Sequence, residues 1–156
     1  MVLPILVIVV LGIVTGGMSY SNAIGVQNAV REGARFGATG DVAQLTWTSD
    51  VIARVRTTQF DDGTTAADSG TSVCVQLFKA PSTVAKWECS LGQDDGPVIT
   101  MPATATDDPA VPANLAPGAC VVRVLAARKF KINGGLTSWS GSIVRGSTAM
   151  YERTCT

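Results

Sequence analysis

The residues that could do chemistry in this chain are few. Histidine is absent, which removes the commonest general base and metal ligand. Clustered carboxylates, which could bind a hard cation such as Ca²⁺, occur as three Asp-Asp pairs at residues 61–62, 94–95 and 107–108. None fits an EF-hand loop, and each lies in a turn-forming run. GxSxG and phosphate-binding glycine loops are also missing. We therefore expect solvated turns here, with no catalytic residues, no metal and no cofactor, and we expect no enzyme.

The cysteines point to structural chemistry instead. They lack the CxxC spacing of zinc and redox sites, which favours two disulfides formed in an oxidising compartment. Three pairings are possible, and hairpin geometry favours one. A hairpin turning at residues 80–82 places Cys74 opposite Cys89. A hairpin folded about the loop 134–141 places Cys120 opposite Cys155. The alternative, four reduced thiols in a cytosolic protein, fits poorly with the apolar N-terminus.

Charge gives no general attraction to nucleic acid. Twelve basic residues balance twelve acidic ones. The balance hides a split, because residues 41–118 carry ten acids and four bases, whereas residues 119–156 carry six bases and one acid. Such a split suits head-to-tail contact between copies, although solvated loops beside a basic strand explain it more simply. Arg128, Lys129 and Lys131 around Phe130 are interpreted as the exposed end of a strand, so no nucleic-acid partner is expected.

The N-terminal segment positions everything else. Residues 1–30 contain no charged side chain. An aliphatic run continued by small residues to about Tyr20 reaches the roughly 20 residues that a membrane-spanning helix needs. A secretory signal is the alternative, but the basic segment that opens such signals is missing. Pro4 is compatible with the first helical turn. The apolar helix residues expected to face membrane or filament core are Leu3, Pro4, Ile5, Leu6, Ile8, Val9, Leu11 and Ile13.

The helical pattern continues to the Thr-Gly-Asp at residues 39–41, which predicts a helix of about 38 residues, near 57 Å long. Small residues recur every four positions along it. Such a ridge lets two backbones approach closely in apolar surroundings, so we expect it to pack against helices of other copies. A flexible glycine-rich hinge is the alternative. The ridge comprises Gly17, Ser21, Gly25, Ala29, Gly33 and Gly37.

The remainder predicts a small head. Residues 46–60 form a short second helix capped by Ser49 or Asp50, and strands follow at 72–79 and 84–90. Residues 91–118 contain five prolines and form a long surface excursion, after which strand character resumes to the C-terminus. The expected class is α+β, with a long N-terminal α-helix, a short second helix and a small antiparallel β-sheet. The expected domains are a hydrophobic helix, 1–38, and a disulfide-stapled head, 39–156.

Several of these residues together resemble the TadE-like pilins and pseudopilins of tight-adherence (Tad) pili, within the type IV pilin group. Two departures stand out. The glutamate and aromatic residue that usually precede the Leu-Pro element are not seen, and Thr15-Gly16-Gly17 replaces a commonly acidic-aromatic stretch. The residues that carry the resemblance are Val2-Leu3-Pro4, Leu11-Gly12-Ile13, Gln27-Asn28-Ala29, Arg31 to Phe36 and, as a closing strand, Gly146 to Glu152.

The resemblance implies a pilin-like fold and a structural role. A prepilin peptidase would process the chain, its helix would hold it in the cytoplasmic membrane with the head outside, and the pilus assembly machinery would draw it into a helical homo-oligomeric filament for surface attachment. Two alternatives keep the fold. One is a minor pseudopilin, an initiator or tip factor that stays mainly in the membrane. The other is a membrane-tethered binding module that uses the excursion 91–118.

Overall fold

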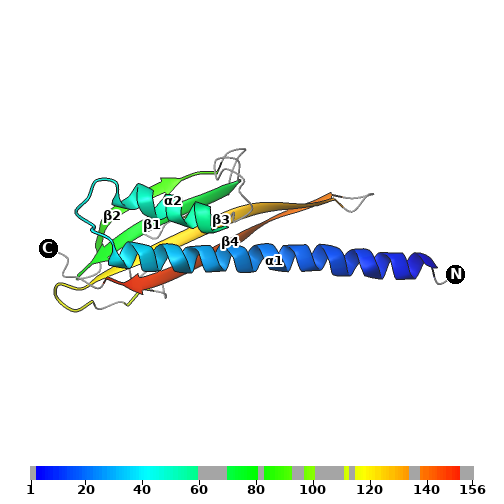
Figure 1. The fold of residues 1–156 in the computed structure, drawn as a ribbon, viewed down its shortest axis with the longest axis horizontal. Helices are drawn as coiled ribbons and strands as arrows, with labels where there is room; N and C mark the ends of the chain where they lie inside the picture. The colour runs from blue at the N-terminus through cyan, green and yellow to red at the C-terminus, as the bar shows by residue number, and fades with distance from the viewer. Residues whose placement is uncertain are drawn as a thin grey trace.

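The computed structural model describes residues 3–59, 70–80, 83–92, 97–100, 111–112, 115–133 and 138–151. Two helices and four strands make up the described fold, which confirms the α+β class with one long helix, one short helix and an antiparallel sheet (Figure 1). Their order is α1 (Leu3–Thr39), α2 (Trp47–Gln59), β1 (Thr71–Lys79), β2 (Thr83–Ser90), β3 (Cys120–Asn133) and β4 (Ser138–Met150).

Helix α1 has 37 residues and ends where the sequence predicts. The Gly40 N–H donates to the Phe36 carbonyl at 3.0 Å, and the Thr39 hydroxyl donates to the same carbonyl at 3.1 Å. Both bonds satisfy the Phe36 carbonyl, which lies in the last turn of the helix. The N-terminal half of α1 extends away from the other elements, whereas the C-terminal half lies along the sheet (Figure 1).

The sheet is wholly antiparallel with strand order β2-β1-β3-β4. Cys74 pairs with Cys89 across β1 and β2, and the two form a disulfide, which confirms that predicted pairing. Cys120 is buried and disulfide-bonded. Its predicted partner, Cys155, lies outside the described residues, so that pairing stays a prediction.

The register predicted for the second hairpin is wrong. The Tyr151 N–H donates to the Cys120 carbonyl at 2.8 Å, so Tyr151 and not Cys155 stands opposite Cys120. The pairing of β3 and β4 continues to Asn133 with Ser138, well inside the predicted loop 134–141. The strands are therefore longer than expected, because the serine- and glycine-rich segment after residue 137 pairs as a strand despite its turn-like composition.

Both helices cover one face of the sheet, α1 over β3 and β4 and α2 over β1 and β2. This is the main core of the described head. The sheet contributes the side chains of every second residue of β1 and β3, which face the helices because successive side chains of a strand point to opposite faces. Its aliphatic members include Val26 and Val30 of α1; Val51, Ile52 and Val55 of α2; Val73, Val75 and Leu77 of β1; and Val122, Val124 and Ala126 of β3.

Helix α2 begins three to four residues earlier than predicted. The expected caps were Ser49 or Asp50, but the helix starts at Trp47 and the Asp50 N–H donates to the Thr46 carbonyl at 2.8 Å. The reason is burial: Trp47 is 2% exposed and packs in the core, so tertiary packing extends the helix through a residue of only moderate helix propensity.

The second face of the sheet is covered in part by the segment predicted as a surface excursion. Val111 and Leu115 are buried against Phe78 of β1 and Val121 of β3. Most of the excursion lies outside the described residues, but these two apolar positions show that a part of it belongs to the core. The division of the chain at residue 38 remains a prediction, and α1 itself contributes to the core of the head.

Replacing both Cys74 and Cys89 by alanine is expected to lower the stability of the head. The disulfide closes a separation of 15 residues, and a loop of that length is worth about 3 kcal/mol through the entropy of the unfolded chain. Thermal unfolding of the full chain in detergent, followed by near-ultraviolet circular dichroism, should show a melting temperature lowered by several degrees. An unchanged melting temperature would mean that the disulfide adds nothing to the hairpin.

Candidate functional site

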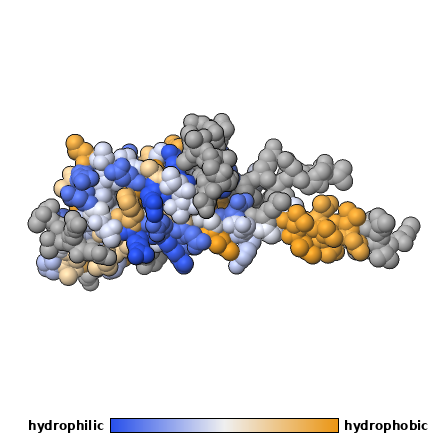
Figure 2. Space-filling view, in the orientation of Figure 1, coloured by the Kyte–Doolittle hydropathy of each residue, from blue (hydrophilic) through white to orange (hydrophobic). Residues whose placement is uncertain are grey.

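The most unusual surface of the molecule is the N-terminal half of α1. Its aliphatic side chains have no cover, although burying one fully is worth about 1.5–3 kcal/mol. They form a continuous apolar block on the free part of the helix (Figure 2). The exposed fractions are 59% for Leu6, 45% for Val7, 54% for Val9, 49% for Val10, 56% for Leu11, 69% for Ile13 and 48% for Val14. Surfaces of this kind belong in a membrane or in an interface.

Four of the predicted apolar residues belong to this helix by their backbone alone. Leu3, Pro4, Ile5 and Ile8 lie within α1, and their side chains are outside the described part. Within the described chain, the stretch Val9–Thr39 is long and apolar enough to cross a membrane. This agrees with the spanning helix predicted from the sequence.

The small-residue ridge divides into two parts. At Gly17 and Gly25 a side-chain β-carbon would meet nothing within 4 Å, and Ser21 is exposed. At Gly37 a β-carbon would lie 2.9 Å from Val122 Cγ1, and at Gly33 it would overlap with Val55 Cγ2. Ala29 is fully buried in the same core. The space beside the C-terminal part of the ridge, at Gly33 and Gly37, is therefore filled by α2 and β3 of the same chain.

The geometry of the helix explains this division. Each residue advances about 100°, so a spacing of four overshoots a full turn by about 40°. Over the five steps from Gly17 to Gly37 the ridge rotates by about 200° around α1. The expectation that the six residues form one face toward neighbouring copies is corrected accordingly: Gly33 and Gly37 face the head, and Gly17 faces the opposite side.

Residues 1–35 match the family model of TadE-like proteins. The resemblance found in the sequence is thereby confirmed for α1, and it suggests a protein associated with Tad pili. The TadE-like segment ends before the sheet begins, so the resemblance of the closing strand is not part of the match. No curated protein and no solved structure matches the chain.

The C-terminal end of the TadE-like helix is clasped by two aromatic side chains. Trp47 Nε1 donates to the Gly37 carbonyl at 3.0 Å, and the Tyr151 hydroxyl donates to the Gly40 carbonyl at 2.8 Å. Tyr151 also accepts from the Val42 N–H at 3.4 Å. Sequence reasoning missed both residues. Their signal was weak, because a tryptophan or tyrosine with a polar tip is suited to many half-buried positions.

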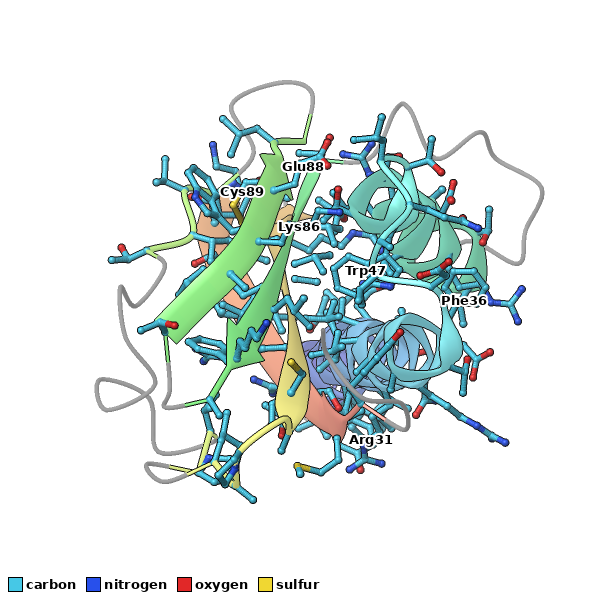
Figure 3. All side chains as sticks on the ribbon, turned by 90° about the vertical axis from the view of Figure 1, so that its left-hand side faces the viewer. Arg31, Phe36, Trp47, Lys86, Glu88 and Cys89 are labelled. Atoms are coloured by element: carbon cyan, nitrogen blue, oxygen red, sulfur yellow. A yellow bond between two sulfur atoms is a disulfide. The ribbon has the colours of Figure 1, made fainter. Side chains whose placement is uncertain are left out.

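Ion pairs contribute little to the packing of α1 on the described part of the head. Glu32 and Arg54 form an ion pair at 2.9 Å, but both side chains are more than a third exposed, so the pair is worth at most about 1 kcal/mol. Among the labelled side chains, Lys86 and Glu88 of β2 lie on the same side of the strand as Trp47 (Figure 3). Lys86 donates to the Val42 and Gln44 carbonyls at 2.8 and 3.0 Å, and Glu88 accepts from the Thr48 hydroxyl.

An open groove of about 370 Å³ lies between α2 and β2. Its lining includes Ile52, Arg56, Glu88 and Ser90. The Arg56 guanidinium is already engaged, because its Nη2 donates to Ser90 Oγ at 2.9 Å.

On β3, burial lowers the pKa of Arg123, which still leaves an arginine protonated at neutral pH. In the described part of the chain, no group of three His, Cys, Asp or Glu residues could hold a metal ion.

Replacing Gly33 by leucine is expected to destabilise the head strongly, and replacing Gly17 by leucine is its matched control. Both changes remove a helical glycine, which alone would stabilise a helix by up to about 1 kcal/mol. At Gly33 the new side chain overlaps with Val55, and overpacking of this kind costs about 1–3 kcal/mol or more. At Gly17 there is open space. Thermal unfolding in detergent should give a lower melting temperature for Gly33→Leu than for Gly17→Leu. Equal melting temperatures would contradict the close packing of Gly33 against Val55.

Proposed function

We propose that this chain is a structural subunit of an extracellular Tad-like filament. In this proposal α1 first anchors the chain in the cytoplasmic membrane with the head outside, and then packs against α1 of other copies in the filament core. The observation that carries the proposal is the uncovered apolar half of α1, together with Gly17 and Gly25, around which a side-chain β-carbon would meet open space. The role is non-catalytic and needs no cofactor.

Membrane and filament core suit the same surface for one physical reason. Both are apolar surroundings in which the aliphatic residues around the helix are covered. In such surroundings helices associate through close packing and not through the hydrophobic effect, and small residues permit the closest approach. Gly17, Ser21 and Gly25 offer such positions on α1, and Gly33 and Gly37 do not, because α2 and β3 already occupy their side of the helix.

This division limits which part of α1 can meet a neighbour. The free stretch from Leu3 to Gly25 is 23 residues, or about 35 Å of helix. That is close to the hydrocarbon thickness of a bilayer, so one length serves both the anchored and the assembled state. The proposal includes processing by a prepilin peptidase and handling by pilus assembly machinery, and the match of residues 1–35 to TadE-like proteins supports it.

Filament assembly can be tested with Gly17→Leu against Gly16→Leu as the matched control. Both glycines lie in open space on the free helix, but Gly16 is about 100° away from the ridge. Filaments sheared from cells that produce each variant would be analysed by quantitative mass spectrometry. We expect Gly17→Leu to lower the amount of this chain in the filaments at least several-fold and Gly16→Leu to leave it near the unsubstituted level.

The same measurement separates the alternatives. A chain that is only a trace component of the unsubstituted filaments would favour a minor pseudopilin that stays mainly in the membrane. Filaments that form normally with both variants, and with this chain abundant, would show that the ridge does not guide assembly. A membrane-tethered binding module would require abundant membrane-bound chain and none in filaments.

A further inference from the structure

The described sheet has two open edges, β2 on one side and β4 on the other. Within the described residues, β2 pairs only with β1 and β4 pairs only with β3. The two edge strands run in opposite directions, because every neighbouring pair in the order β2-β1-β3-β4 is antiparallel. A second copy placed beside the first in the same orientation therefore brings its β2 edge next to the β4 edge of the first.

The proposed filament puts copies in this relation. Its α1 helices run parallel to each other at the centre. Both helices cover one face of the sheet, so with α1 at the centre the sheet lies outside it, and the β2 and β4 edges point toward the copies on either side. Each copy then offers β4 to one neighbour and β2 to the other. Such a head-to-tail contact suits an open helical assembly, because it leaves one edge available at each step.

The two edges carry opposite charges on the face that the helices cover. Arg145 of β4 is exposed and pairs with Ala126 of the main core, and Glu88 of β2 is exposed and pairs with Val75 of the same core. Within the described residues neither side chain forms an ion pair. The same polarity holds more widely, since β2 belongs to the acidic stretch 41–118 and β4 to the basic stretch 119–156.

The two charges do not meet within one head. Three strand spacings separate β2 from β4, which is about 14 Å across the sheet. Glu88 is level with Val124 through β1, whereas Arg145 pairs with Ala126, so the two also lie two residues apart along the strands. That offset is about 7 Å. Between copies, a small shift along the filament or the length of the two side chains takes it up.

Exposed apolar side chains lie beside these charges on the other face of the sheet. Trp87 of β2 is 65% exposed, and Val144 of β4 is 49% exposed. Each directly precedes one of the two charged residues, so its side chain points to the opposite face. Tryptophan is enriched among the residues that dominate binding at protein interfaces. Each edge therefore offers one charged and one apolar side chain, on opposite faces of the sheet.

We propose that neighbouring copies in the filament meet edge to edge, with Arg145 of one copy paired with Glu88 of the next and Val144 packed against its Trp87. This inference rests on the proposed filament. Side chains make the contact, and the sheet does not continue from copy to copy. Adjacent strands turn by about 20–25°, so a continuous sheet would turn each successive copy by about 80–100°, and the α1 helices could not stay parallel.

Zero-length cross-linking tests the charged pair. Sheared filaments that carry Arg145→Lys would be treated with a carbodiimide, which joins a carboxylate to an amine in direct contact, and then digested for mass spectrometry. We expect a product that joins residue 88 to residue 145. Monomer of the same variant in detergent is the control and should give none, because the two residues lie far apart in one head. A product in the monomer, or none in filaments, would overturn the inference.

Charge exchange tests the same contact without chemical modification. Arg145→Glu and Glu88→Arg each place like charges together, so each should lower the amount of this chain in sheared filaments about fivefold or more. The double variant should recover most of the unsubstituted amount. Thermal unfolding in detergent checks folding, since Glu88→Arg also removes the acceptor of the Thr48 hydroxyl. Single variants at the unsubstituted level, or a folded double variant without recovery, would contradict the pairing.

The amount of unsubstituted chain in the filaments separates the two proposals. Chain that is absent from sheared filaments would contradict the proposed function, and the inference would fail with it. Chain that is abundant there, but gives neither the cross-link nor the recovery, leaves the filament proposal intact and overturns the edge-to-edge contact alone.

Discussion

The close approach of α1 to α2 and β3 at Gly33 and Gly37 is the contact on which the rest of the structure depends. A helix surface without side chains lets Val55, Val51 and Val122 pack directly against the backbone of α1. Interiors packed at this density tolerate little change, so the position and rotation of α1 on the head are fixed within a narrow range. The direction and rotation of the free N-terminal half of α1 are therefore set by its packing on the head.

One continuous helix thus belongs to two environments. Its C-terminal half supplies Val26, Ala29 and Val30 to a conventional core, whereas its N-terminal half exposes aliphatic side chains all around. Because the small-residue ridge rotates around α1, its C-terminal positions Gly33 and Gly37 pack against the head. Its N-terminal positions, from Gly17 to Gly25, face whatever surrounds the free helix. A spacing of three and four in alternation would have kept the ridge on one side and placed head and neighbour in competition for it.

Much of this could be predicted from the sequence, for reasons that are local. An uncharged segment of 30 residues predicts an apolar helix, alternation predicts strands, and a short turn predicts that Cys74 faces Cys89. The parts that could not be predicted depend on distant contacts. Trp47 lengthens α2 because it is buried under α1, and Ser138 to Ser142 pair as a strand because β3 offers them a partner. The rotation of the ridge follows from its four-residue spacing, but which of its positions face the head depends on where the head packs, and the sequence of α1 does not show that.

The aromatic clasp at the end of α1 has a mechanical consequence. Trp47 bonds the Gly37 carbonyl from the start of α2, and Tyr151 bonds the Gly40 carbonyl from the end of β4. Traction applied along α1 would therefore be shared between α2 and β4, which are far apart in the sequence. Because β3 and β4 run lengthwise beside α1, their ladder would be loaded in shear, with many hydrogen bonds resisting together, and not opened one bond at a time.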